Sequence, residues 1–206
     1  MIHRHIGVMS SAQNRAARRA ANTREMLLLS AGKLFQEVGY PEASIHRIAA
    51  AVNAPKGTFY NYFRSKEELA LILVDRQFAA IYQSLSLEAG ESAYDQLNHH
   101  FQFLAMEPPM IEIAPLQLLA IFAAEAAAIP PDIGQRIADG IHVWDRQLGD
   151  LISLAHIEKG TPAAHSTKLA LLLTTCWFGA IVRRKSDPSL KLVDELLPTL
   201  LRLGVF

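Results

Sequence analysis

A short polar cluster near residue 60 gathers the side chains of this 206-residue chain that are best suited to bind a polyanion. Lys56 supplies an ammonium group, and Gly57 beside it allows the backbone to come close to a partner. Tyr60, Asn61 and Tyr62 add two phenols and an amide. Such groups donate hydrogen bonds to phosphate oxygens, and asparagine also pairs with the edge of adenine. The cluster therefore predicts a nucleic-acid interface.

Two short helices joined by a tight turn would position this cluster. Helical spacing of apolar residues predicts a first helix at 45–52, with Ser44 as its N-cap and Asn53 ending it in the left-handed conformation. Pro55 precedes a second helix at 56–62. Proline is tolerated at the start of a helix, because the N–H that it lacks would have no partner within the helix there. Two helices separated by about three residues match the helix-turn-helix, whose second helix enters the DNA major groove.

The charge is divided unevenly along the chain, although it sums to zero. Residues 1–66 carry ten basic and three acidic side chains, a net charge of +7. Residues 67–206 carry ten basic and seventeen acidic side chains, a net charge of −7. A basic first third is typical of a polyanion binder. We therefore expect a flexible basic arm at 1–21, a DNA-binding domain at 22–66 and a ligand-binding and dimerisation domain at 67–206.

The fold class is predicted to be all-α, with about nine helices. Apolar residues recur every three or four positions, and strand-like alternation is nearly absent. Gly39 should end the helix that precedes the helix-turn-helix. Ser65 and Glu68 have the spacing of a capping box and should open a long helix. The expected later helices cover 66–88, 92–106, 110–128 with a break near Pro115, 132–158, 162–184 and 190–203.

The composition argues against secreted, membrane and catalytic classes. A single cysteine, Cys176, permits no disulfide framework and suits a cytoplasmic protein. The apolar runs 110–129 and 169–182 are interrupted by charge or too short to span a bilayer, so buried helices are expected there. Glycine-rich phosphate loops, nucleophile elbows and zinc-binding helix motifs are not found. We expect no enzyme, no cofactor and no metal; the histidines should be partly exposed surface or pocket residues.

The stretch from Thr23 to Leu69 resembles the TetR family of transcription regulators, most clearly in IAAAVNAPKGTFYNYF at 48–63 and SKEEL at 65–69. The resemblance implies a homodimer that places two recognition helices on a palindromic operator. It also implies repression that is relieved when a small molecule enters the C-terminal domain. The sequence departs from the family pattern at Asn53, where glycine is usual, and at Pro55, where serine or threonine is more common.

By position, the resemblance assigns roles to eight residues of the helix-turn-helix region. The family's phosphate contacts match Ser44, Lys56, Tyr60, Tyr62 and Lys66, with Gly57 allowing close approach and Thr58 and Asn61 nearer the bases. Phe59 and Phe63, four residues apart, should instead form one buried stripe.

The rest of the chain suggests a ligand pocket and a dimer seam. Helical bundles place pockets between helices, lined by apolar and aromatic residues, so an apolar or aromatic effector is expected. The pocket candidates are Phe78, Tyr82, His99, Phe103, Phe122, Glu125, His142 and Trp144, with His100 beside them. The last two helices carry apolar, small-residue faces that should pair in an intersubunit four-helix bundle, as the resemblance implies. The seam candidates are Leu172, Cys176, Gly179, Ala180, Val193, Leu197 and Leu200.

Other functions stay open at this point. A DNA-binding architectural protein or activator without an effector would have a filled C-terminal core. An enzyme carrying a regulatory helix-turn-helix would need a polar catalytic cluster. The arm at 1–21 is either a solvated tail or an extra contact to DNA.

Overall fold

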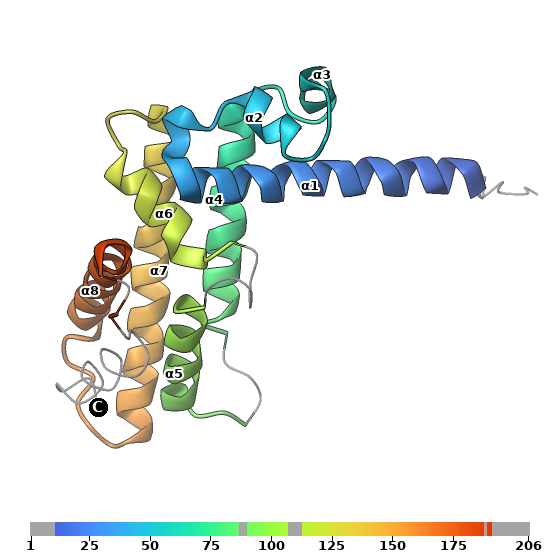
Figure 1. Cartoon of the computed structure of the whole chain (residues 1–206). Helices are drawn as coiled ribbons and strands as arrows, with labels where there is room; N and C mark the ends of the chain where they lie inside the picture. Colours follow the sequence, from blue (N-terminus) through green and yellow to red (C-terminus); the bar gives the residue numbers. More distant parts are fainter. Residues whose placement is uncertain (1–10, 87–89, 107–112, 188, 191–206) are drawn as a thin grey trace, which may run out of the picture.

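The computed structural model describes residues 11–86, 90–106, 113–187 and 189–190, and these residues form eight helices and no strand (Figure 1). The predicted all-α class is confirmed. The ninth helix expected at 190–203 lies almost wholly outside the described residues. The helices are α1 (Ser11–Glu42), α2 (Ile45–Ala50), α3 (Lys56–Tyr60), α4 (Lys66–Gln83), α5 (Ala93–Leu104), α6 (Pro115–Ala124), α7 (Pro131–Glu158) and α8 (Ser166–Ser186).

Helices α1, α2 and α3 pack into a small unit at one end of the molecule (Figure 1). Its apolar core is fully buried and includes Phe35 from α1, Ile48 from α2 and Phe59 from α3. Gly39 interrupts the helical path of α1 with φ of 82° and ψ of 171°. Side chains rarely tolerate this conformation, so glycine is required where the chain turns toward α2.

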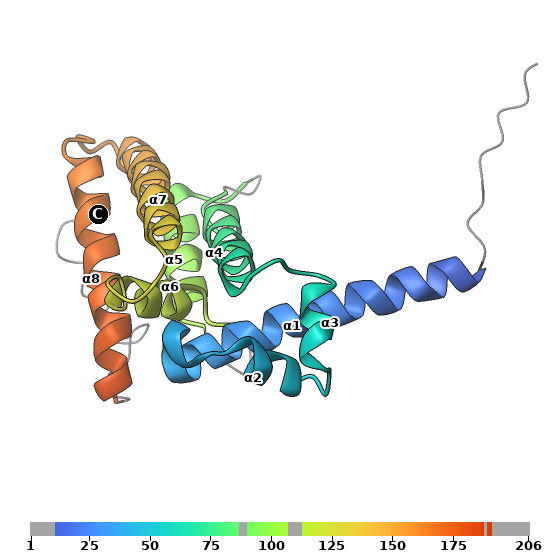
Figure 2. The ribbon, with the colours of Figure 1, turned by 90° about the horizontal axis from the view of Figure 1, so that it is seen from above.

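Helix α1 begins earlier than the sequence predicted. It is helical from Ser11, so the expectation of a flexible arm is wrong for residues 11–21, while residues 1–10 lie outside the described part. The segment contains five alanines and neither glycine nor proline, and alanine has the highest helix propensity. Figure 2 shows α1 continuing past α3 with no other helix beside its first turns.

The short helices end two residues before their predicted ends. Tight i→i+3 bonds close both: Asn53 N donates to Ala50 O at 3.0 Å, and Tyr62 N donates to Phe59 O at 3.0 Å. Asn53 has φ of 54°, the left-handed conformation predicted for it. The turn between the helices thus has the predicted geometry.

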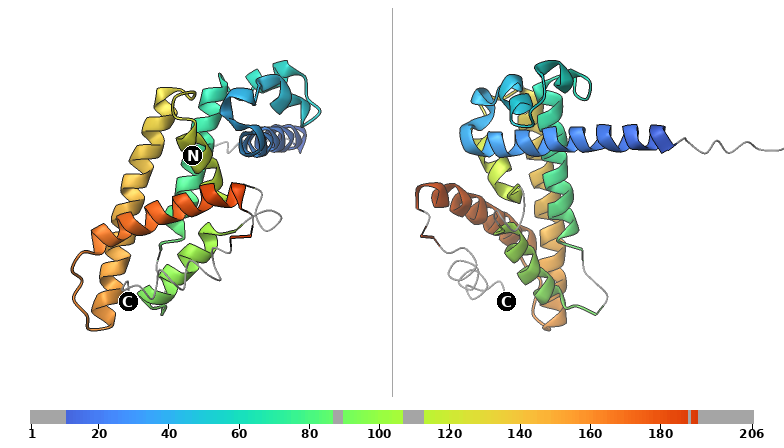
Figure 3. Two further views of the ribbon diagram at one scale, coloured as in Figure 1. Left: turned by 60° about the vertical axis from the view of Figure 1, so that its left-hand side comes forward. Right: turned by 45° about the vertical axis from the view of Figure 1, so that its right-hand side comes forward.

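Helices α4 to α8 form the rest of the molecule, the C-terminal layer (Figure 1). Helix α4 leaves the small unit and runs along α7 in this layer. Helix α8 packs across α7, and α5 and α6 complete this layer (Figure 3). The core there is aromatic, with Phe101, Trp144 and Trp177 almost completely buried. Within the described ranges, none of the helices combines the length and apolar character that a membrane span requires.

Candidate nucleic-acid interface and domain junction

The start of α2 and the core beneath α3 fix the helix-turn-helix. Ser44 caps α2: its Oγ accepts a hydrogen bond from Arg47 N at 3.2 Å. Ser30 of α1 donates through its Oγ to Ile48 O at 3.1 Å, which ties α2 to the long helix. The rings of Phe59 and Phe63 lie 5.4 Å apart and are buried, as their spacing predicted.

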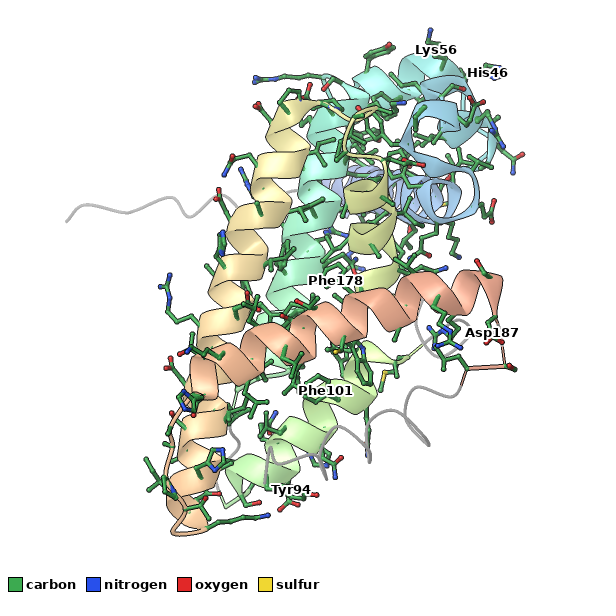
Figure 4. The ribbon with its side chains drawn as sticks, turned by 90° about the vertical axis from the view of Figure 1, so that its left-hand side faces the viewer. His46, Lys56, Tyr94, Phe101, Phe178 and Asp187 are labelled. Carbon is green, nitrogen blue, oxygen red and sulfur yellow. The ribbon has the colours of Figure 1, made fainter. Side chains whose placement is uncertain are left out.

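The outer side of α3 presents the predicted polar groups to solvent. Lys56, Gly57, Tyr60 and Asn61 are exposed, Tyr60 with 52% of its surface, whereas Thr58 is half-buried. A Cβ added at Gly57 would meet no atom within 4 Å, so open space lies beside this backbone. Figure 4 places Lys56 at the end of the molecule far from Tyr94 of α5. These groups are therefore free to meet a partner.

Two further candidates lie in α2 and were missed by sequence reasoning. His46 and Arg47 are exposed, and Figure 4 shows His46 at the same end as Lys56. The guanidinium of Arg47 donates to Glu42 O at 3.1 Å. The sequence signal that could have identified them is the pair of basic residues in the helix before α3. Tyr62 and Ser44 complete the predicted set, half-buried and exposed respectively.

Lys66 differs from the other predicted phosphate contacts because its ammonium group has internal partners. Its Nζ donates to Tyr40 O at 2.7 Å and lies 4.0 Å from the centre of the Tyr40 ring. Burial lowers the pKa of Lys66, and Glu125 and Glu42 oppose that shift. The charge of Lys66 therefore helps to hold the end of α1 after the Gly39 kink, and its predicted phosphate contact stays a prediction.

Glu125 joins the small unit to the C-terminal layer. It caps the end of α6, and its Oε2 accepts a hydrogen bond from Tyr40 N at 2.8 Å. A Cβ at Gly39 would lie 2.0 Å from Glu125 Oε1, so the carboxylate approaches the backbone where only glycine leaves room. Burial raises the pKa of Tyr40 to about 12, with Glu67 adding to the shift. Glu125 was expected in a ligand pocket; the structure uses it as a domain contact.

The other proposed pocket residues differ in their exposure. Phe78, Phe122 and Trp144 are buried in the packed core, Phe103 is half-buried, and His99 and His142 are exposed. Tyr82 donates to Gly140 O at 3.0 Å and lines an open hollow of about 300 Å³ between α4 and α7. The eight-residue set thus divides among core, surface and domain contact.

His100 is fully buried, against the expectation of a partly exposed histidine. Trp144 donates through Nε1 to its Nε2 at 3.0 Å, so the ring proton is on Nδ1, which donates to Ser84 Oγ at 2.8 Å. Ser84 Oγ then donates to Ile81 O at 2.8 Å. Burial lowers the pKa of His100 to about 3. This neutral chain of hydrogen bonds fixes the end of α4 to α5 and α7.

Helix α8 leaves part of the predicted seam uncovered. Leu172 is 54% exposed and Gly179 is exposed, whereas Cys176 is half-buried and Ala180 is buried. Val182, which belongs to the same predicted apolar face, is 47% exposed, and Leu171, which was not predicted there, is 55% exposed. Val193, Leu197 and Leu200 lie outside the described residues.

No group of three metal-ligating side chains occurs in the part of the chain that the structure describes.

Comparison with known proteins finds a family match in the N-terminal part of the chain and weaker similarity over most of its length. Residues 27–72 match the family model of "Bacterial regulatory proteins, tetR family". The repressor NemR of Escherichia coli K12 is 34% identical over 84 residues, which cover 39% of this chain and 42% of NemR. The regulator AcuR of Cereibacter sphaeroides is 25% identical over 177 residues, 84% of this chain and 81% of AcuR. The crystal structure of reduced E. coli NemR gives a TM-score of 0.71 at 22% identity, covering 87% of this chain and 96% of that structure.

Proposed function

We propose that this chain, which belongs to the TetR family of transcription regulators, is a homodimeric repressor that binds a palindromic operator and is released by a small molecule. The similarity to NemR spans less than half of that protein, so the activity of the whole chain is inferred from its site. As a regulator it would act in the cytoplasm, on DNA, and would carry no catalytic activity of its own.

One observation carries the proposal: the exposed polar side of α3 faces away from the C-terminal layer. In a helix-turn-helix the second helix lies in the major groove. Lys56 at the start of α3 would contact phosphate with the free amides there, since a helix N-terminus attracts anions. Asn61 would read base edges. The proposed contacts are Ser44, Lys56, Gly57, Thr58, Tyr60, Asn61 and Tyr62.

The dimer would form through α8 and the segment that follows it. Leu171, Leu172 and Val182 expose large apolar side chains on α8. A surface of this kind marks a protein contact more often than a solvated face. Gly179 lies among them with open space around it, so a partner helix could approach the backbone closely. A two-fold pair of such faces matches a palindromic operator.

An effector would act through the contact between α6 and the turn after α1. An apolar or aromatic molecule in the C-terminal layer would displace α6, and Glu125 would carry the displacement to the Tyr40 backbone. Helix α4 connects the same two layers and spans about 27 Å at 1.5 Å per residue. By linkage, operator DNA must weaken effector binding by the factor by which the effector weakens DNA binding.

Selection from a random duplex library tests the DNA-binding proposal. The full chain should recover one inverted repeat, with half-sites about one helical turn apart. A recovered pool without an enriched sequence would overturn sequence-specific recognition. An enriched single half-site would overturn the dimer instead.

A further inference from the structure

We infer that the projecting start of α1 is a second DNA-binding element, which contacts the phosphate backbone beside each half-site. This inference rests on the proposed function, because it concerns DNA outside the bases that α3 would read. It assigns a role to Arg18 and Arg19, which the helix-turn-helix contacts leave out.

The charge of this element is one-sided and uncompensated. The first 24 residues contain five arginines and no acidic side chain. Glu25, the first acid along the chain, is held by Arg76 of α4 through two hydrogen bonds of 2.6 and 2.8 Å. Arg18 and Arg19 are exposed, and among the described residues they have no ion-pair partner. A polyanion is the partner that this charge fits.

The direction of the element is fixed relative to α3. The guanidinium of Arg24 lies 5.2 Å from the centre of the Phe63 ring, which packs at 5.4 Å on Phe59 of α3. The Arg76–Glu25 pair joins the next residue of α1 to α4. The root of the projecting helix is therefore attached on two sides, so the helix leaves the small unit at a defined point beside α3.

The reach of the element suits a contact beside the half-site. Figures 1 and 2 show α1 passing α3 and continuing away from the C-terminal layer. Residues 11–23 extend about 20 Å at 1.5 Å per residue, which corresponds to roughly six base pairs of one DNA strand. Contacts made there would be to phosphates and would add affinity without base preference.

Duplexes of two lengths test the inference with the full chain. The inverted repeat recovered by selection is prepared with its ends cut at the half-sites, and again with ten base pairs added on each side. Wild-type protein should bind the longer duplex more tightly. Arg18→Gln/Arg19→Gln should lose that gain, and on the longer duplex its log–log salt slope should fall by about 3.6, because the dimer loses four phosphate contacts. Arg18→Lys/Arg19→Lys should retain the gain.

The matched control removes two positive charges far from the interface. Arg146 of α7 and Lys159 at the end of α7 are exposed, and Lys159 Nζ lies 4.4 Å from the centre of the Tyr94 ring, at the end of the molecule opposite Lys56 (Figure 4). Arg146→Gln/Lys159→Gln should therefore keep the gain from the added base pairs. An equal gain for Arg18→Gln/Arg19→Gln and wild type would overturn the inference and leave α3 recognition intact. Failure to recover any repeat would overturn the proposed function. The salt slopes of wild type and variants would then be compared on one random 40-base-pair duplex. Equal slopes would overturn the inference there too.

Discussion

Two lysines in this chain look alike in sequence but differ in their surroundings. Lys56 and Lys66 both follow a turn and both match the phosphate contacts of the family. Only Lys56 is exposed; Lys66 donates to the Tyr40 carbonyl, which is 26 residues away in the chain. Residue type and local spacing predict the first role. The contact of Lys66 with Tyr40 depends on how the chain folds back between these residues, and local sequence patterns carry no information on that.

Alanine substitution should separate the two lysines. Lys56→Ala should lower DNA affinity and reduce the log–log salt slope by about 1.8, because each protomer of the dimer loses one phosphate contact, while the free energy of unfolding changes by no more than about 0.5 kcal/mol. Lys66→Ala should lower the free energy of unfolding by about 1.5 kcal/mol, because a hydrogen bond from a charged group is lost. Urea titration and fluorescence anisotropy measure the two effects. Equal stability of both variants would contradict the internal role of Lys66.

The buried His100 should make the stability depend on pH. Its pKa is about 3 in the folded chain and 6.5 as a free side chain, so between these values the unfolded chain binds one more proton. Stability is therefore fully present above pH 6.5 and falls by about 1.4 kcal/mol for each pH unit below it. Urea titrations at pH 7, 5.5 and 4.5, followed by tryptophan fluorescence, should show a weaker pH dependence for His100→Gln than for wild type. His99→Gln, at an exposed neighbour, should behave as wild type; an unchanged slope for His100→Gln would refute this account.

The helices themselves follow largely from the sequence. Apolar periodicity, the Ser65 cap and the Gly39 turn predict their order, and the structure shows Ser65 Oγ accepting from Glu68 N at 3.0 Å. The start of α1 was missed because a basic, alanine-rich segment was taken for a tail although it contains no helix breaker. The pocket set stays a prediction: residue type ranks the candidates, but which of them share a space depends on how the helices cross.

Two glycines in α7 should respond oppositely to alanine. A Cβ at Gly140 would lie 2.3 Å from the Phe78 ring, whereas a Cβ at Gly134 would meet nothing within 4 Å. Gly134→Ala should raise the free energy of unfolding by about 0.5–1 kcal/mol through helix propensity. Gly140→Ala should lower it by about 1–3 kcal/mol, because Phe78 must move within a packed core. Urea titration compares them, and stabilisation by both would show that α4 and α7 are not in close contact.

At the scale of the whole molecule, the basic and acidic parts of the chain coincide with its two layers. The basic part forms the unit that would meet DNA, and the acidic part forms the layer that would stay away from it. The function assigned to each part stays a prediction. The proposed pairing of two molecules would use the apolar face of α8, and the other predicted seam residues lie outside the described residues.

A charge placed on that face should separate the protomers. Gly179→Glu would bury an unpaired carboxylate in the proposed seam, at a cost of several kcal/mol. Sedimentation velocity should show a monomer, and binding to the inverted repeat should weaken with it. Gly134→Glu, at an open position near the start of α7, should remain a dimer. A stable Gly179→Glu dimer would place the interface elsewhere.

The most direct test of the central claim, that α3 reads DNA in a symmetric pair, is to repeat the duplex selection with Asn61→Ala. Asn61 is exposed at the end of α3, where its amide would pair with a base edge. The account predicts that the recovered repeat loses its preference at one position in each half-site, with the two positions related by the two-fold axis. An Asn61→Ala pool with the wild-type repeat, at undiminished preference in every position, would contradict it.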